Sequence, residues 1–343
     1  MSKPARVTGE KIWLDGRLVP FADATVHVLT HTLHYGLGVF EGIRCYRTSD
    51  GRSAVFRLGE HVRRLLDSAH INLMQVPYTQ AELVAAILDT LRANHLTEGY
   101  VRPLAFIGDG VMGLNPADNP IRVAIIAYPW GKYLGEEGME LGIRAKISTF
   151  ARHFVNSKMT KGKTCGDYVN SILAKREALL DGYDEAILLD PHGLVSEASG
   201  ENIFAVHQGE LLTPPLYGVL GGLTRDAVVH LARDKGIPFR ESEITRDKLY
   251  IADEVFLTGT AAEVTPVREI DHRKIGSGRR GPVTKTLQGA FFDVVAGPVP
   301  SQGRRRKPVS LLELPRSRQR SSAPRRNAFS LISSEGAAVR TIP

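Results

Sequence analysis

Apolar segments of strand length alternate with amphipathic segments of helical period over the first 300 residues of this chain. Segments 100–107 and 121–128 are apolar runs rich in β-branched residues, which is typical of buried strands. Segment 61–71 instead places Val62, Leu65 and Leu66 on one face of a helix. Because alternating strands and helices cover one another in layers, the fold class is expected to be α/β, or mixed α+β.

A second alternating block follows segment 129–135, where Pro and Gly residues indicate a connection between domains. Its predicted helices are 169–180, 223–232 and 283–295, and its predicted strands are 186–189, 203–206 and 210–212. We therefore expect a small N-terminal α/β domain over residues 1–128, an interdomain loop over 129–137 and a large domain over 138–298.

Residues 1–300 carry only −1 of the total net charge of +7, because residues 301–343 hold ten Lys or Arg against two Glu, a net charge of +8. Pro, Ser and Arg dominate this segment, and no apolar period continues beyond Val295. Residues 299–343 are therefore expected to be a disordered basic tail. Such a tail can bind nucleic acid or an anionic membrane surface. Its composition favours a solvated end instead, so no nucleic-acid partner is expected.

The rest of the sequence excludes several classes of protein. No apolar run has the length of a membrane span and the N-terminus lacks an apolar signal core, so we expect a cytoplasmic protein without a membrane partner. Two distant thiols, Cys45 and Cys165, exclude a disulfide framework. The motifs GxGxxG, GxxxxGK[ST], GxSxG and HExxH are all absent. The closest histidine pair, His31 and His34, is interpreted as structural, so no metal is expected.

Lys163 is the first candidate for chemistry, because it stands immediately before a predicted helix in the segment KGKTCGDY. A lysine that enters a buried site loses its proton by desolvation and attacks an aldehyde as a Schiff-base nucleophile. Lys158 and Lys161 lie nearby, so an ordinary surface lysine remains the alternative explanation.

Glu197 and Glu201 flank small residues in the segment VSEASGENIF. A cofactor with a pyridinium nitrogen needs one carboxylate beside it, because the protonated nitrogen preserves the electron sink. A polar hairpin turn is the alternative explanation of this segment.

Two glycine-containing segments are candidate phosphate sites, LGGLTRD at 220–226 and TGTAA at 258–262. The first opens onto a helix, whose free backbone N–H groups and dipole favour a phosphate dianion. Each segment could also be an ordinary capped loop.

Taken in chain order, these segments resemble the branched-chain amino acid aminotransferases, a class IV pyridoxal-phosphate-dependent family, over nearly all of residues 8–296. The matching segments are HTLHYG at 31–36, VFEGIR at 39–44, EHVRRL at 60–65, YVRP at 100–103, KTCGDY at 163–168, NSILA at 170–174, GYDEA at 182–186, the Glu197 segment and both glycine segments. The resemblance implies a fold-type IV enzyme, with two α/β domains and pyridoxal 5'-phosphate between them. It also implies a homodimer or a dimer-based assembly, in which the small domain of one subunit contributes to its neighbour's site.

The resemblance assigns roles to single residues. Lys163 is expected to bind the cofactor aldehyde covalently and to move the α-proton. Glu197 is expected beside the pyridinium nitrogen, and Tyr168 beside the phenolic oxygen. The phosphate ligands implied are Arg64, Leu223, Thr224 and Thr260.

The resemblance also implies a substrate pocket. Tyr100, with the backbone of Thr260 and Ala261, is expected to receive the α-carboxylate. Arg102 is expected to take the side-chain carboxylate of glutamate. The side-chain pocket implied is Tyr35, Phe40, Leu114, Trp130, Tyr133 and Tyr168.

The expected reaction is the reversible transamination of L-leucine, L-isoleucine and L-valine with 2-oxoglutarate, to give branched 2-oxo acids and L-glutamate. Its expected setting is branched-chain amino-acid biosynthesis. A D-amino acid aminotransferase or an aminodeoxychorismate lyase of the same fold would keep Lys163 and Glu197, but these relatives lack the YVR pattern at 100–102. Asp167 departs from the family, which usually has Asn or Tyr at this position.

Overall fold

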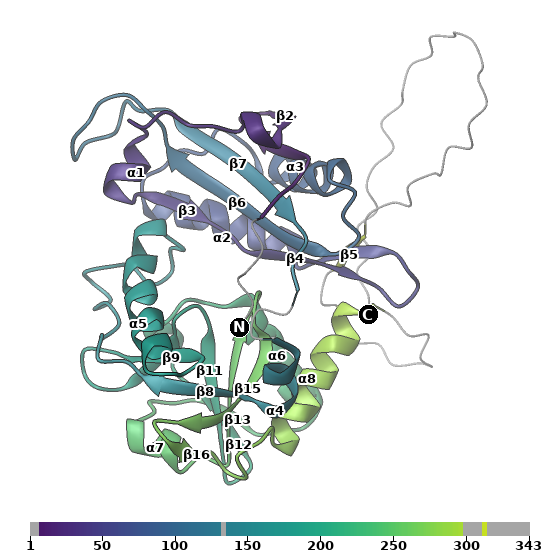
Figure 1. The fold of residues 1–343 in the computed structure, drawn as a ribbon, viewed down its shortest axis with the longest axis vertical. Helices are drawn as coiled ribbons and strands as arrows, with labels where there is room; N and C mark the ends of the chain where they lie inside the picture. Colours follow the sequence, from purple (N-terminus) through teal and green to yellow (C-terminus); the bar gives the residue numbers. More distant parts are fainter. Residues whose placement is uncertain (1–6, 132–134, 298–310, 314–343) are drawn as a thin grey trace.

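The computed structural model describes residues 7–131, 135–297 and 311–313 of the chain. Figure 1 shows two sheets, one above the other, each with helices packed against it. Within these described residues no helix is both long and apolar enough to cross a membrane.

The first sheet is antiparallel, and it has the order β17-β5-β4-β6-β7-β1-β2 with β3 paired to β6. Its strands are β1 (Lys11–Leu14), β2 (Arg17–Pro20), β3 (Gly38–Phe40), β4 (Ile43–Arg47), β5 (Ser53–Phe56), β6 (Gly99–Ile107), β7 (Ile121–Tyr128) and β17 (Leu311–Glu313). Its helices are α1 (His31–Tyr35), α2 (Leu58–Ile71) and α3 (Gln80–Ala93). A capping box between Thr79 and Glu82 begins α3. The apolar faces of α2 and α3 pack on the sheet and form one buried cluster around Leu65, Ile87 and Val101.

The second sheet is mixed, and it has the order β10-β9-β8-β15-β14-β11-β12-β13 with β16 paired to β15. Its strands are β8 (Ile143–Ile147), β9 (Glu185–Leu189), β10 (Val195–Ala198), β11 (Asn202–His207), β12 (Glu210–Thr213), β13 (Phe239–Glu241), β14 (Glu254–Gly259), β15 (Glu263–Ile270) and β16 (Arg273–Lys274). Its helices are α4 (Gly135–Leu141), α5 (Tyr168–Leu180), α6 (Leu223–Asp234), α7 (Arg246–Tyr250) and α8 (Pro282–Val295). Strand β8 is parallel to both of its neighbours, β9 and β15.

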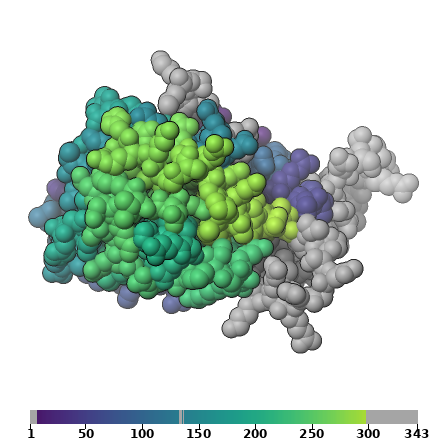
Figure 2. All heavy atoms as spheres, turned by 90° about the horizontal axis from the view of Figure 1, so that it is seen from below, coloured from purple at the N-terminus to yellow at the C-terminus, as the bar shows by residue number. Residues whose placement is uncertain are grey.

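The two sheets share part of one core. Helices α6 and α8 bury an apolar cluster that contains the stacked rings of Phe204 and Phe256, whose centroids are 5.0 Å apart. Phe56 of β5 joins this cluster and packs edge-on against Phe291, at 5.6 Å between centroids. The end of α8 also reaches the turn between β4 and β5, which lies beside it in Figure 2. The edge of the first sheet is thus held against the second domain.

The expected fold class and all of the expected strands and helices are confirmed, with two corrections. The segment expected to be an interdomain loop ends in α4, because Met139 is buried against the sheet and Gln288 donates a hydrogen bond to its carbonyl oxygen. The tail expected to be disordered contains β17, which pairs with the edge strand β5. An edge strand offers unpaired backbone groups to any nearby extended segment. The remainder of the tail lies outside the described residues.

Candidate active site

A cavity of about 300 Å³ is lined by residues of both domains. Phe40, Arg64 and Tyr100 line it from the first sheet and its helices, whereas Lys163 and Glu197 line it from the second domain. The expected cofactor residues all line this cavity, namely Arg64, Lys163, Tyr168, Glu197, Leu223, Thr224 and Thr260. Five of the expected substrate residues also line it, namely Phe40, Tyr100, Arg102, Trp130 and Ala261.

Lys163 reaches the cavity from the segment before α5, and the first domain holds its backbone. Its N–H donates to Ser68 Oγ at 3.0 Å, and its carbonyl oxygen accepts from the N–H of Phe40 at 3.1 Å. Its Nζ lies 2.6 Å from the hydroxyl oxygen of Tyr168, in the first turn of α5. These contacts fix the direction of the amine toward the cavity.

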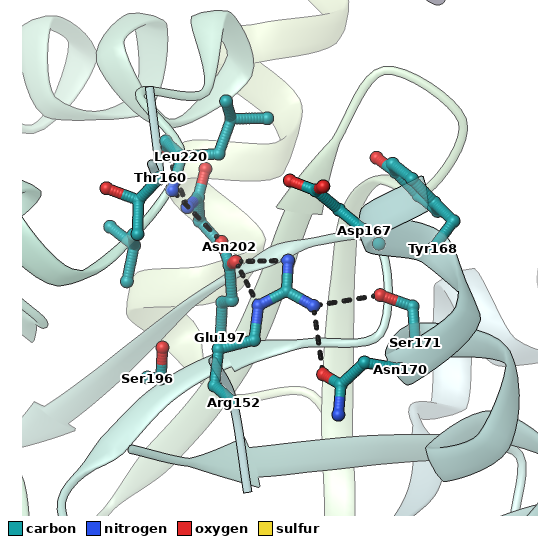
Figure 3. Close-up of polar contacts among 12 residues, drawn as sticks. Arg152, Thr160, Asp167, Tyr168, Asn170, Ser171, Ser196, Glu197, Asn202 and Leu220 are labelled. Carbon is teal, nitrogen blue, oxygen red and sulfur yellow. Dashed lines mark hydrogen bonds and ion pairs between the residues drawn. The ribbon is translucent and has the colours of Figure 1, made fainter. Parts of the chain in front are cut away.

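Glu197 is buried on β10, and an arginine that we did not predict from the sequence holds it. Nε and one terminal nitrogen of Arg152 lie 2.9 and 2.8 Å from Oε1 of Glu197. Arg152 also donates to Ser171 Oγ at 3.0 Å and to Asn170 Oδ1 at 3.4 Å, so its guanidinium lies between β10 and α5 (Figure 3). The backbone N–H of Leu220 donates to the other carboxylate oxygen at 3.2 Å. No sequence motif marks Arg152; the only signal is that a buried carboxylate needs a cation.

The start of α6 forms one wall of the cavity. Gly222 is the N-cap, and Leu223 and Thr224 follow it in the first turn. The first N–H groups of a helix have no partner within it, and the dipole favours an anion there. A Cβ on Gly222 would overlap Oδ1 of Asn202, so a larger residue would have to displace this side chain, which donates to the carbonyl oxygen of Leu220 at 2.9 Å. A phosphate group fits this combination of a helix N-terminus and the neighbouring Arg64.

Arg64 is itself held by a buried acid. Glu41 is completely buried, and its carboxylate accepts from Nε and a terminal nitrogen of Arg64 at 2.5 and 2.9 Å and from Nδ1 of His61 at 2.7 Å. Burial alone would raise the pKa of Glu41, but Arg64 and His61 outweigh it and hold that pKa well below its usual range. Burial lowers the pKa of His61, so the neutral ring is the donor in this cluster.

The charge of Glu41 should make the stability of the protein depend on pH. Because its pKa is lower in the folded chain, the stabilisation should be fully present above the ordinary value of 4.5 and lost as the pH falls further. We expect Glu41→Gln to cost about 3 kcal/mol of unfolding free energy at neutral pH, since it leaves Arg64 without its counter-charge. Urea unfolding of both proteins between pH 7.5 and pH 3.5 measures the difference. A difference that stays constant with pH would contradict the assignment.

Aromatic side chains and one arginine line the part of the cavity where the substrate is expected. The guanidinium of Arg102 donates to the Tyr100 hydroxyl at 3.1 Å and lies 4.5 Å from the ring centroid of Phe40. The ring of Trp130 packs against Tyr100, at 5.3 Å between centroids. The buried side-chain atoms of the described residues that lack a hydrogen-bond partner include two from the cavity lining, Nε of Arg102 and Oγ1 of Thr258. Such groups at a cavity wall fit a polar ligand.

Two expected substrate residues do not line the cavity: Tyr35 is 45% exposed and Leu114 is 90% exposed. A third, Tyr133, lies outside the described residues. His31 connects the first two, because its ring packs on Tyr35 at 4.5 Å and its Nε2 lies 2.7 Å from the carbonyl oxygen of Gly113. In a single chain, Tyr35 and Leu114 therefore belong to one exposed corner of the first domain.

A lysine, a carboxylate and a helix N-terminus with a neighbouring arginine thus meet in one cleft between two α/β domains. This fold and site define a pyridoxal-phosphate enzyme of fold type IV. A family model described as amino-transferase class IV matches residues 38–270. The chain belongs to the class IV aminotransferase family.

Relatives with this fold are found among branched-chain aminotransferases. The branched-chain-amino-acid aminotransferase of Pseudomonas aeruginosa is 53% identical over 286 residues, which cover 83% of this chain and 93% of that protein. The crystal structure of the Escherichia coli branched-chain amino acid aminotransferase is 48% identical with a TM-score of 0.83, over 84% of this chain and 96% of that one. The Thermobaculum terrenum enzyme of the same name, solved in its PLP-form, is 35% identical with a TM-score of 0.79, over 84% and 94% of the two chains.

Proposed function

We propose that this chain transfers the amino group between L-leucine, L-isoleucine or L-valine and 2-oxoglutarate, with pyridoxal phosphate as its cofactor. The observation that carries the proposal is the single cavity shared by the Lys163–Tyr168 pair, the Glu197–Arg152 pair and the start of α6. The Pseudomonas aeruginosa and Escherichia coli relatives, at 53% and 48% identity, support the choice of branched-chain substrates.

Each residue of the cavity has a separate role in the proposed reaction. Bound pyridoxal phosphate supplies an electron sink for negative charge at the substrate α-carbon. The Nζ of Lys163 would hold the cofactor aldehyde until the substrate amine displaces it, and the freed amine would then take and return the α-proton, while Tyr168 keeps this nitrogen in place. Glu197, fixed by Arg152, pairs with the ring nitrogen. Arg64, Thr260 and the first turn of α6 hold the phosphate, which orients the bond to be broken.

One pocket must accept both an apolar side chain and a carboxylate. Phe40 and Trp130 provide apolar surface. One methylene in such a pocket changes the free energy of the transition state by only about 1–3 kcal/mol, so all three branched substrates should react. In this proposal Arg102 receives the side-chain carboxylate of glutamate, which its contacts with the Tyr100 hydroxyl and the Phe40 ring at the cavity wall support. Tyr100 and the backbone of Thr260 and Ala261 take the α-carboxylate.

A second copy of the chain completes the pocket in this proposal. Tyr35 and Leu114 are exposed in one chain, as are the apolar side chains of Leu33 in α1 and of Val28 shortly before it. Surfaces of this kind are typical of protein interfaces. We propose a homodimer, or an assembly of dimers, in which this corner faces the neighbour's cavity. The cysteines Cys45 and Cys165 are unpaired, which suits the cytoplasmic location that we propose.

A spectroscopic titration tests the function. Purified protein with pyridoxal phosphate should show the visible band of the bound cofactor, and L-leucine should remove it while D-alanine leaves it unchanged. Added 2-oxoglutarate should then restore the band, because the second half-reaction returns the cofactor aldehyde. A response to D-alanine alone would replace the substrate assignment by that of a D-amino acid aminotransferase. Absence of any visible band would contradict the cofactor assignment.

A further inference from the structure

Two arginines of the first domain contact the start of α6 in the second domain: Arg57, the N-cap of α2, and Arg64 within α2. Arg64 donates to the carbonyl oxygen of Gly221 at 2.8 Å. Arg57 donates to the carbonyl oxygen of Leu223 at 3.0 Å and to Oδ2 of Asp226 at 2.7 Å. The two guanidiniums therefore hold carbonyl groups on either side of Gly222, the N-cap of α6. Arg57 has no role in the reaction as described above.

The backbone of Arg57 has an energetically unfavourable conformation, which indicates that the surrounding structure holds this residue against α6. Arg57 is the N-cap of α2 and has φ 50° and ψ 41°, in the left-handed region. This conformation costs a residue other than glycine about 1 kcal/mol, and it persists only where the surroundings determine it. The side chain is 15% exposed, and its Nε is also paired with Glu60 at 3.0 Å. Both ends of the guanidinium are thus fixed.

The contact of Arg57 with the Leu223 carbonyl oxygen also affects the backbone of Thr224, a residue that lines the cavity. A peptide unit is planar and trans, so the carbonyl of one residue and the N–H of the next point in opposite directions. Holding the Leu223 oxygen therefore also holds the N–H of Thr224, which lines the cavity. The contact with Asp226 has an electrostatic effect, because an unpaired carboxylate in the first turn of α6 would repel a phosphate dianion.

We infer that Arg57 is a positioning residue for the cofactor phosphate, which it serves by orienting the first turn of α6 and neutralising Asp226. The inference rests on the proposed placement of the phosphate at the start of α6. It predicts that the phosphate contribution to cofactor affinity depends on Arg57, although this side chain does not itself line the cavity.

The test compares pyridoxal phosphate with pyridoxal, which lacks the phosphate, in the full-length Arg57→Asn protein. Asparagine tolerates the left-handed region, so the variant removes the guanidinium without adding backbone strain. We expect the dissociation constant for pyridoxal phosphate, measured by absorption titration, to rise about tenfold while that for pyridoxal stays unchanged. Arg57→Asn combined with Asp226→Asn should recover part of this loss. The matched control is Arg63→Asn on the same helix, because Arg63 is exposed and pairs with Asp67.

Two outcomes overturn the inference. Equal weakening of both ligands would mean that Arg57 has only a structural role, and an unchanged constant for pyridoxal phosphate would mean that it has none. A further variant, Thr224→Asp, tests independently whether the phosphate lies at the start of α6. This variant puts a negative charge on a residue that lines the cavity at the helix start, where it would repel a phosphate dianion. If Thr224→Asp lowers the phosphate-dependent affinity and Arg57→Asn does not, the phosphate placement stands and the role of Arg57 is wrong.

Discussion

The Lys163→Ala variant is expected to lose transamination activity by on the order of 10⁴-fold, and to lose covalent attachment of the cofactor. The loss is large because one nitrogen atom has two tasks, binding the aldehyde and moving the α-proton. The Nζ of Lys163 lies 2.6 Å from Tyr168 Oη and in the same cavity as Glu197. Activity is measured with L-leucine and 2-oxoglutarate. Attachment is measured as the mass of the protein after borohydride reduction.

The matched control is Lys161→Ala, two residues away. Lys161 contacts the carbonyl oxygens of Leu216 and Val219 in the loop before α6, so it is structural in the described chain. We expect this variant to keep the reducible attachment. If Lys163→Ala still gains the mass of the cofactor after reduction, or if Lys161→Ala loses it, the assignment of the catalytic lysine is wrong.

The Glu197→Gln variant is expected to lower kcat by about 10²-fold, because an amide cannot balance the positive charge of a protonated ring nitrogen. Cofactor affinity should change less than kcat, since Arg64 and the start of α6 are unaltered. The substitution also leaves Arg152 without its counter-charge, which should cost about 3 kcal/mol of unfolding free energy. Activity, cofactor affinity and urea unfolding are measured together, so that a folding defect is recognised as such.

Glu201→Gln is the comparison for this prediction. Burial and the neighbouring carboxylate of Glu185 raise the pKa of Glu201 to about 8. Below that pH, Glu201 is mainly protonated and resembles glutamine in charge, so its substitution should reduce kcat much less at pH 7. If the two variants have equal effects at pH 7, the separate roles of these carboxylates are refuted.

The secondary structure was predictable because it depends on local patterns. The spacing of Val62, Leu65 and Leu66 predicts the buried face of α2, and the apolar run at 100–107 predicts β6. Helix α4 and strand β17 were not predictable in this way. The first depends on the burial of Met139 against β15, and the second on an unpaired sheet edge. Neither condition is visible in the local sequence.

The residues of the candidate site likewise include some that the local sequence predicts and some that it does not. Lys163, Glu197 and the glycine segment before α6 could be proposed because each has the residue types that its chemistry needs within a few consecutive positions. Arg152 and the buried Glu41–His61 pair could not, since they act on another side chain rather than on a ligand. Tyr35 and Leu114 were expected from the resemblance, and their exposed position in one chain is a property of tertiary structure.

The sequence by itself determined which elements form and which residues could bind an aldehyde, a ring nitrogen and a phosphate. Both are local properties of hydrophobic period and side-chain chemistry. The tertiary structure alone decided which charges meet: Arg152 and Glu197 are 45 positions apart, and Arg57 and Asp226 are 169 positions apart. Pairing over such separations depends on how the elements and the two domains pack, because only the folded chain brings these charges within contact distance.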